Sequence, residues 1–189
     1  MIRVQPSAFL MAAALVLLLP LDWLCAVLLA SAVHEIGHLA AIYAFGGHAD
    51  SVTIGLRGAE IHTVFPDKRK ELFCAAAGPA ASFLLIFLYR FSPKLAVCAA
   101  VQGMFNLIPV YPMDGGRMLR CFLQWLCPRQ ADRICRIVEG LIVSAVFVLS
   151  LRLLICRKDG VLPALVCVTA LTRLLFGKIP CKSGGSAVQ

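Results

Sequence analysis

The chain has 189 residues, of which 60% are hydrophobic and only 15% are charged, and its formal net charge is +8. Soluble domains are about half apolar and about a quarter charged, so this composition excludes an ordinary water-soluble fold and favours a polytopic membrane protein. Basic residues in such a chain are expected in the loops that flank membrane spans. The positive charge therefore does not predict a nucleic-acid partner.

Nine cysteines are spread singly along the chain, without C-x-x-C pairs, and most lie in or beside apolar runs. A free cysteine in such a setting behaves as a small hydrophobic residue. The sequence therefore predicts neither a disulfide framework nor a cysteine metal site.

The first apolar segment, about residues 7–21, predicts a short first transmembrane helix. A cleaved signal peptide is the alternative interpretation, with Ala30-Ser31-Ala32 as the small-residue cleavage site. Cleavage there would leave the metal motif described next at a new N-terminus and would destroy its helix. We therefore favour a retained helix.

The second apolar run, residues 23–45, contains His-Glu-Ile-Gly-His at residues 34–38, which fits the H-E-x-x-H pattern of zinc proteases. Residues four apart share one face of a helix, so His34 and His38 can offer both imidazoles to one zinc ion. Glu35 adjoins them and can act as a general base towards a water molecule at the metal. A chance match with two packed histidines is the alternative. Glu35 is the only charge in this run, and ionisable residues at membrane depth are usually functional, so the metal interpretation is favoured.

Residues 50–71 form the first long polar segment, after Gly46 and Gly47 signal the end of the second helix. Two stretches with β-branched residues, 51–55 and 59–64, predict a short β-hairpin. Its edge strand could pair with an extended substrate, but an ordinary connecting hairpin is the favoured interpretation. His48 and His62 lie in this part of the chain and are expected to be solvated loop residues rather than metal ligands.

Residues 72–91 and 94–108 predict the third and fourth helices. The small residues at 75–82 would let the third helix approach its neighbours closely within a membrane. Two prolines then break the helix between Asn106 and Gly116, and irregular backbone at membrane depth occurs where it is buried or lines a cavity. Asp114 is therefore a candidate third metal ligand. A solvated aspartate in a surface turn is the alternative.

Residues 115–140 contain five arginines among apolar residues and predict an interfacial helix that is broken near Pro128. Residues 137–154 and 161–176 predict the fifth and sixth spans. The expected fold is thus an all-α polytopic membrane protein of about six transmembrane helices, with a short β-hairpin between the second and third, in a single domain over residues 1–189. Most of the 18 lysines and arginines fall on the side of both predicted termini, which predicts that the termini are cytoplasmic. Asp114 can then fold back towards the two histidines.

Three stretches of the chain resemble the site-2 proteases, a family of intramembrane zinc metalloproteases. They are the H-E-x-x-H motif, the small-residue segment 77–82, and residues 106–116, which resemble the family segment N-x-x-P-x-x-P-x-D-G. Together they cover about residues 23–120, the expected catalytic core. The plan looks most like the branch that includes a sporulation protease acting on a sigma-factor precursor, without the PDZ or CBS domains of some relatives.

This resemblance implies that His34, His38 and Asp114 bind one Zn²⁺ per chain, that Glu35 is the catalytic base, and that Asn106 helps to hold substrate. It implies an intramembrane metalloendopeptidase that cleaves a membrane-associated protein or pro-protein near the cytoplasmic side. The implied partners are this substrate, the lipid bilayer and a regulatory membrane protein.

Two other functions are compatible with the same residues. A membrane scaffold could retain the metal site without catalysis, and an ion transporter could use the charges within the membrane. The sequence lacks the paired half-repeats with matching breaks that such transporters often show, so the transporter is the less favoured of the two.

Overall fold

The computed structural model describes residues 2–4, 9, 13, 15–47, 51–55, 58–62 and 67–157, and the account below concerns those residues. The chain divides into two compact units, Met1–Cys135 and Arg136–Gln189. The first unit contains the sheet and all of the helices discussed below except most of the last one. The single-domain description remains a prediction.

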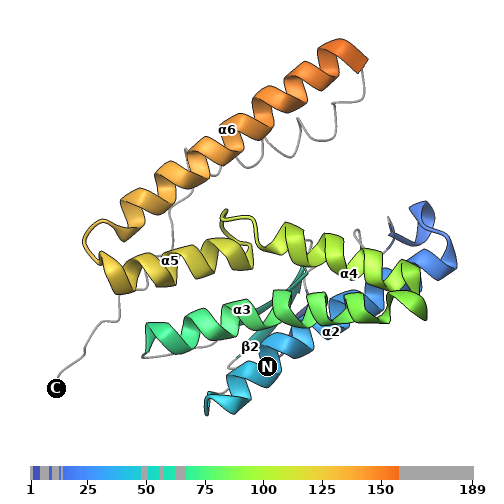
Figure 1. Ribbon diagram of the computed structural model, residues 1–189, viewed down its shortest axis with the longest axis horizontal. Helices are drawn as coiled ribbons and strands as arrows, with labels where there is room; N and C mark the ends of the chain where they lie inside the picture. Colours follow the sequence, from blue (N-terminus) through green and yellow to red (C-terminus); the bar gives the residue numbers. More distant parts are fainter. Residues whose placement is uncertain are drawn as a thin grey trace. The chain divides into compact units, whose positions relative to one another are not determined.

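The elements follow one another in an order dominated by helices (Figure 1). They are β1 (Ile2–Val4), α2 (Leu21–Ala44), β2 (Ser51–Gly55), β3 (Gly58–His62), α3 (Lys68–Leu84), the 3₁₀ helix η1 (Leu85–Arg90), α4 (Pro93–Asn106), α5 (Asp114–Leu126) and α6 (Ala131–Arg157). Most of the predicted first span, residues 7–21, lies outside the described residues, although residues 15–18 are helical. The predicted sixth span, residues 161–176, also lies outside them.

Within the described residues, two helical stretches, Leu21–Ala44 and Lys68–Arg90, are long and apolar enough to cross a membrane. A span needs about 20 apolar residues, and α2 has 24. The first stretch ends where predicted, because Gly46 adopts φ +73°, a conformation that favours glycine and terminates a helix.

The start of α3 differs from the sequence prediction. The helix begins at Lys68, four residues before the predicted start at residue 72, because the carboxylate of Asp67 accepts a hydrogen bond from the backbone N–H of Arg69 at 2.9 Å. This is an N-cap interaction, which satisfies a free donor of the first turn. The charged run therefore forms the first turn of the helix, whereas hydropathy marks only its apolar part.

The polar segment between α2 and α3 contributes two strands to a three-stranded sheet in the order β1-β2-β3, and the third strand comes from the N-terminal residues Ile2–Val4. Strands β2 and β3 pair antiparallel, with Val52 opposite Ile61 and Gly55 opposite Gly58, in the stretch where the sequence predicted a hairpin. Strand β1 pairs parallel to β2, and the sequence did not predict this strand, because three residues show almost no periodicity.

Helix α3 packs against α2, α4 and α5, so it lies at the centre of the first unit (Figure 1). Its contact with α2 is close at Gly37, where a Cβ would lie 2.7 Å from both the carbonyl oxygen of Ala77 and the Cβ of Ala81. The small residues predicted to permit close helix packing therefore do so at this crossing.

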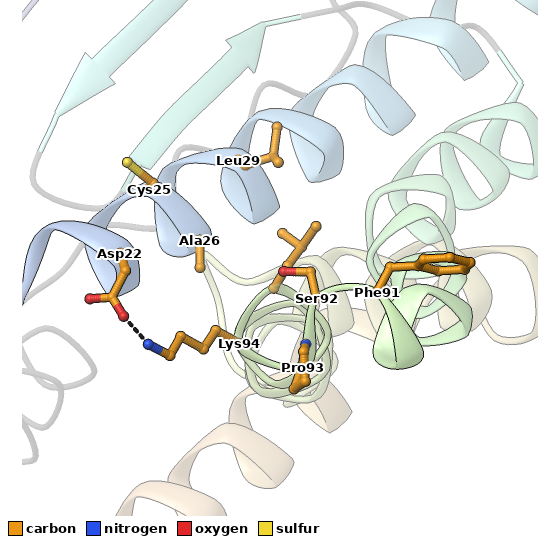
Figure 2. Close-up of a pocket in the computed structure, with 9 residues that line it drawn as sticks. Asp22, Cys25, Ala26, Leu29, Phe91, Ser92, Pro93 and Lys94 are labelled. Atoms are coloured by element: carbon orange, nitrogen blue, oxygen red, sulfur yellow. Dashed lines mark hydrogen bonds and ion pairs between the residues drawn. The ribbon is translucent and has the colours of Figure 1, made fainter.

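The N-terminal ends of α2 and α4 meet at a different place. Asp22 and Lys94 form an ion pair there, beside a pocket of about 410 Å³ that Leu29, Phe91 and Leu95 help to line (Figure 2). Asp22 lies twelve residues before His34 on the same helix, about 18 Å away at 1.5 Å per residue. This pocket is therefore separate from the metal motif.

The arginine-rich segment is broken as predicted, because α5 ends at Leu126 and α6 begins at Ala131, on either side of Pro128. Helix α6 then continues to Arg157 without interruption. The second half of the predicted interfacial helix and the predicted fifth span are thus one continuous helix.

Candidate metal centre

The two motif histidines lie on the buried face of α2. His34 is 3% exposed and His38 is 7% exposed, and the helical repeat places their rings one turn apart with centroids separated by 4.9 Å. Their Nε2 atoms approach each other to 3.3 Å. The interpretation that both imidazoles face one point is therefore supported by the geometry.

Asp114 reaches the same point from a distant part of the sequence. The chain leaves α4 at Asn106, runs through a non-helical segment that contains the cis Tyr111–Pro112 peptide bond, and enters α5 at Asp114 itself. At the next residue, Gly115, a Cβ would lie 2.1 Å from the carbonyl oxygen of Leu107. Only glycine fits there. Because the backbone at Gly115 packs directly against that at Leu107, the neighbouring Asp114 lies beside the histidines.

Three ligand atoms converge at the centre. Asp114 Oδ2 lies 3.0 Å from His34 Nε2 and 3.1 Å from His38 Nε2. Zinc bound tetrahedrally with bonds of about 2.0–2.1 Å needs ligand atoms about 3.3 Å apart. Among the described residues, these three form a group that could hold a metal ion, and their spacing and chemistry fit zinc.

The outer nitrogen of each imidazole has a partner on α3. Nδ1 of His38 lies 2.8 Å from the carbonyl oxygen of Cys74, and Nδ1 of His34 lies 2.9 Å from the hydroxyl of Ser82. A carbonyl only accepts, so His38 must donate from Nδ1, which leaves Nε2 free to bind a metal. Such outer partners orient metal-binding histidines and fix their tautomer.

The remaining predicted residues border this centre. Glu35 is half-buried and lies within electrostatic reach of both histidines, Asp114 and Arg117. Nδ2 of Asn106 lies 3.4 Å from His34 Nε2, so the side chain predicted to contact substrate faces the metal ligands. The arrangement places a carboxylate and an amide beside the convergent ligand atoms.

The charge of Asp114 follows from its neighbours. Burial raises the pKa of this carboxyl, but in the metal-free centre hydrogen bonds from protonated His34 and His38, together with their charge, lower it to about 2. The group is therefore an anion at neutral pH, as a metal-binding carboxylate must be.

The side chains of the other two histidines are not among the described parts of the chain. His48 lies outside the described residues, and His62 is in strand β3, where only the backbone is described. Sequence reasoning missed the Ser82 hydroxyl and the Cys74 carbonyl. The signal for Ser82 was a single hydroxyl in an apolar helix, which was interpreted only as a small residue suited to packing.

No protein-family model matches the chain. It is similar to a zinc metalloprotease of Methanocaldococcus jannaschii, with 31% identity over 106 residues that cover 48% of this chain and 31% of the relative. The chain thus matches less than a third of the length of that curated relative. It is also similar to the solved structure of a site-2 protease from Methanocaldococcus jannaschii, with a TM-score of 0.67 and 20% identity, over 92% of this chain and 88% of that chain. This likeness shows a shared fold.

Proposed function

We propose that this chain is an intramembrane zinc metalloendopeptidase that cleaves a membrane-associated protein. The observation that carries the proposal is the convergence of His34, His38 and Asp114 on one point, with Glu35 beside two of them in the sequence. The shared fold with a site-2 protease and the local similarity to a zinc metalloprotease support it.

In the proposed mechanism, His34, His38 and Asp114 hold one zinc ion per chain. When bound, zinc polarises a carbonyl oxygen and lowers the pKa of a water molecule to about 7. Glu35 accepts the proton of the attacking water and passes it to the nitrogen of the leaving amine. The Glu35 carboxylate can both accept and donate this proton, because it is close to the ligands and is not itself a ligand.

Asn106 is proposed to bind the substrate beside the ligands. Its side-chain N–H groups can donate to the substrate backbone or to the carbonyl oxygen that gains charge during attack. The substrate must unwind locally before it reaches Asn106, because the carbonyls of an intact helix are occupied by internal hydrogen bonds.

The proposed setting is a cell membrane with about six spans and cytoplasmic termini. The charge distribution supports this orientation. With the chain oriented in this way, the cleavage site would lie near the cytoplasmic side. We further propose that the chain falls in the branch that includes the sporulation sigma-factor protease, on the basis of its short polar link between α2 and α3. The partners would be a membrane-associated pro-protein and a regulatory membrane protein.

The deciding experiment is a comparison of the membrane proteomes of cells that carry the wild-type chain or Glu35→Gln. A precursor that accumulates only with Glu35→Gln, and that the purified wild-type protein then cleaves, is the expected result. Wild-type protein that binds zinc but cleaves no accumulated precursor would instead favour the metal-binding scaffold. Metal flux through the protein in vesicles would favour the transporter.

A further inference from the structure

Ser82 is a fully buried hydroxyl on a helix that is otherwise apolar around it. The residue is 0% exposed, and α4 closes over it at Gly103, where a Cβ would lie 3.2 Å from the Ser82 Cβ. Its Oγ lies 2.9 Å from Nδ1 of His34. The hydroxyl is therefore held against one metal ligand, in a place from which solvent is excluded.

The two histidines differ in the kind of partner that α3 gives them. His38 faces the backbone carbonyl of Cys74, which every side chain at that position would supply. His34 faces a side-chain hydroxyl, which only Ser82 supplies. A side-chain substitution at residue 82 can thus remove the acceptor of His34, whereas no side-chain substitution at residue 74 removes the carbonyl that accepts from His38.

The chemistry of the imidazole defines what Ser82 must do. When Nε2 of His34 bonds to a metal, the ring proton must be on Nδ1, and a buried N–H needs an acceptor. The hydroxyl oxygen of Ser82 is the acceptor in reach. With Ala at residue 82, the Nδ1–H group would be buried without this partner, and the tautomer that binds metal through Nε2 would be disfavoured.

We propose that Ser82 is a positioning residue for the metal site, which holds His34 in the tautomer and orientation that present Nε2 to the ion. The inference rests on the proposed function in one respect, because it assumes that the bound ion is zinc. It concerns metal affinity before any substrate is present, so it is tested without a cleavage assay.

The experiment uses the full chain, purified in detergent and stripped of metal, and a titration of zinc against a chromophoric chelator. Ser82→Ala is expected to weaken zinc binding about 10- to 100-fold, as the loss of an outer partner of a metal-binding histidine does elsewhere. Ser82→Thr keeps the hydroxyl and is expected to retain more of the zinc affinity than Ser82→Ala.

A matched control is available on α2. Ser31 also makes a hydrogen bond between helices, donating from Oγ to Gln102 Oε1 at 3.4 Å, and it lies one turn before His34 without contacting a ligand. Ser31→Ala is expected to bind zinc as the wild-type chain does. Equal zinc affinities for Ser82→Ala and Ser31→Ala would overturn the role of Ser82.

A second measurement needs no variant at Ser82. In the zinc-loaded wild-type chain, ¹⁵N NMR of the histidine side chains should show His34 protonated at Nδ1 and coordinated through Nε2, with His34→Gln used for assignment. Coordination through Nδ1 would overturn the inference even if Ser82→Ala did not fold. A wild-type chain that takes up no zinc would overturn the proposed function itself, and the inference with it.

Discussion

Gly78 of α3 lies directly against the imidazole of His38. A Cβ at residue 78 would be 2.1 Å from Nε2 of His38, the atom that points at the metal centre, and 2.5 Å from its Cε1. No side chain fits at this distance. The metal site therefore depends on the absence of a side chain at Gly78, which lets α3 pack directly against the His38 ring. In this position the carbonyl of Cys74, also on α3, accepts a hydrogen bond from the other nitrogen of the same ring.

Gly78→Ala should therefore damage the metal site more than the fold. The added methyl group must displace the His38 ring or separate α2 from α3, and we expect zinc affinity to fall by about 100-fold, at the upper end for changes beside metal ligands. The measurement is a zinc titration combined with thermal unfolding of the metal-free protein.

Gly140→Ala is the matched control for this substitution. Apart from its chain neighbours and the backbone of its own helix, no described atom lies within 4 Å of the position that its Cβ would occupy, and alanine in a helix interior is favoured over glycine by about 0.5–1 kcal/mol. We expect unchanged zinc binding and equal or slightly higher stability. Normal zinc affinity in Gly78→Ala would show that the His38 ring can move aside freely.

The assignment of Asp114 as the third ligand leads to a separate prediction. Asp114→Ala removes the only carboxylate among the three convergent atoms, so most of the zinc bound by the wild-type chain should be lost. Metal content by mass spectrometry after gel filtration is the measurement.

Asp67→Ala, which removes an exposed N-cap carboxylate that is not one of the three ligands, should keep its zinc, although α3 would lose about 1 kcal/mol of stability. Full zinc occupancy in Asp114→Ala would refute the third-ligand assignment.

The sequence predicted the parts of this site that follow from local pattern. Helical spacing alone puts His34 and His38 on one face, and the prolines after Asn106 mark a broken segment that can return Asp114. The structure brings these atoms to within 3.3 Å of one another. Each of these features depends on the pattern of a few neighbouring residues, so it can be predicted without knowledge of how the helices pack.

The outer partners were not predictable in the same way. That Ser82 meets His34 and Cys74 meets His38 depends on the register of α2 against α3, and this register is set by close contacts such as Gly37 against Ala77. Hydropathy also failed to show where α3 ends, because Leu85–Arg90 is equally apolar but adopts a 3₁₀ conformation. Long-range register and helix type are properties of the packed chain.

The predicted orientation can be tested with a native residue. Cys127 is exposed, just after the end of α5, on the side predicted to be cytoplasmic. In a chain with the other cysteines replaced, a membrane-impermeant maleimide should label Cys127 only after cells are permeabilised. Ser92→Cys, between η1 and α4 on the opposite predicted side, should be labelled in intact cells. The reverse pattern would show that the chain is inverted in the membrane.

The last prediction separates metal binding from chemistry at Glu35. The side chain is half-buried beside the ligands and is not one of the three convergent groups. Gln has nearly the same size and keeps the hydrogen-bonding reach, but it cannot accept a proton as a carboxylate does. Glu35→Gln should therefore keep its zinc and its fold, and it should be at least as stable as the wild-type chain, because a charge at membrane depth is unfavourable.

Cleavage by Glu35→Gln should fall about 10²- to 10⁴-fold, the usual contribution of a general acid–base group. Zinc content, thermal unfolding and cleavage of the accumulated precursor should be measured on the same preparation, with Asp114→Ala as the variant that loses both metal and activity. A Glu35→Gln protein that keeps zinc and retains uncleaved precursor in a complex would also identify the substrate. Cleavage at near wild-type rate by that variant would rule out Glu35 as the base, whatever its zinc content.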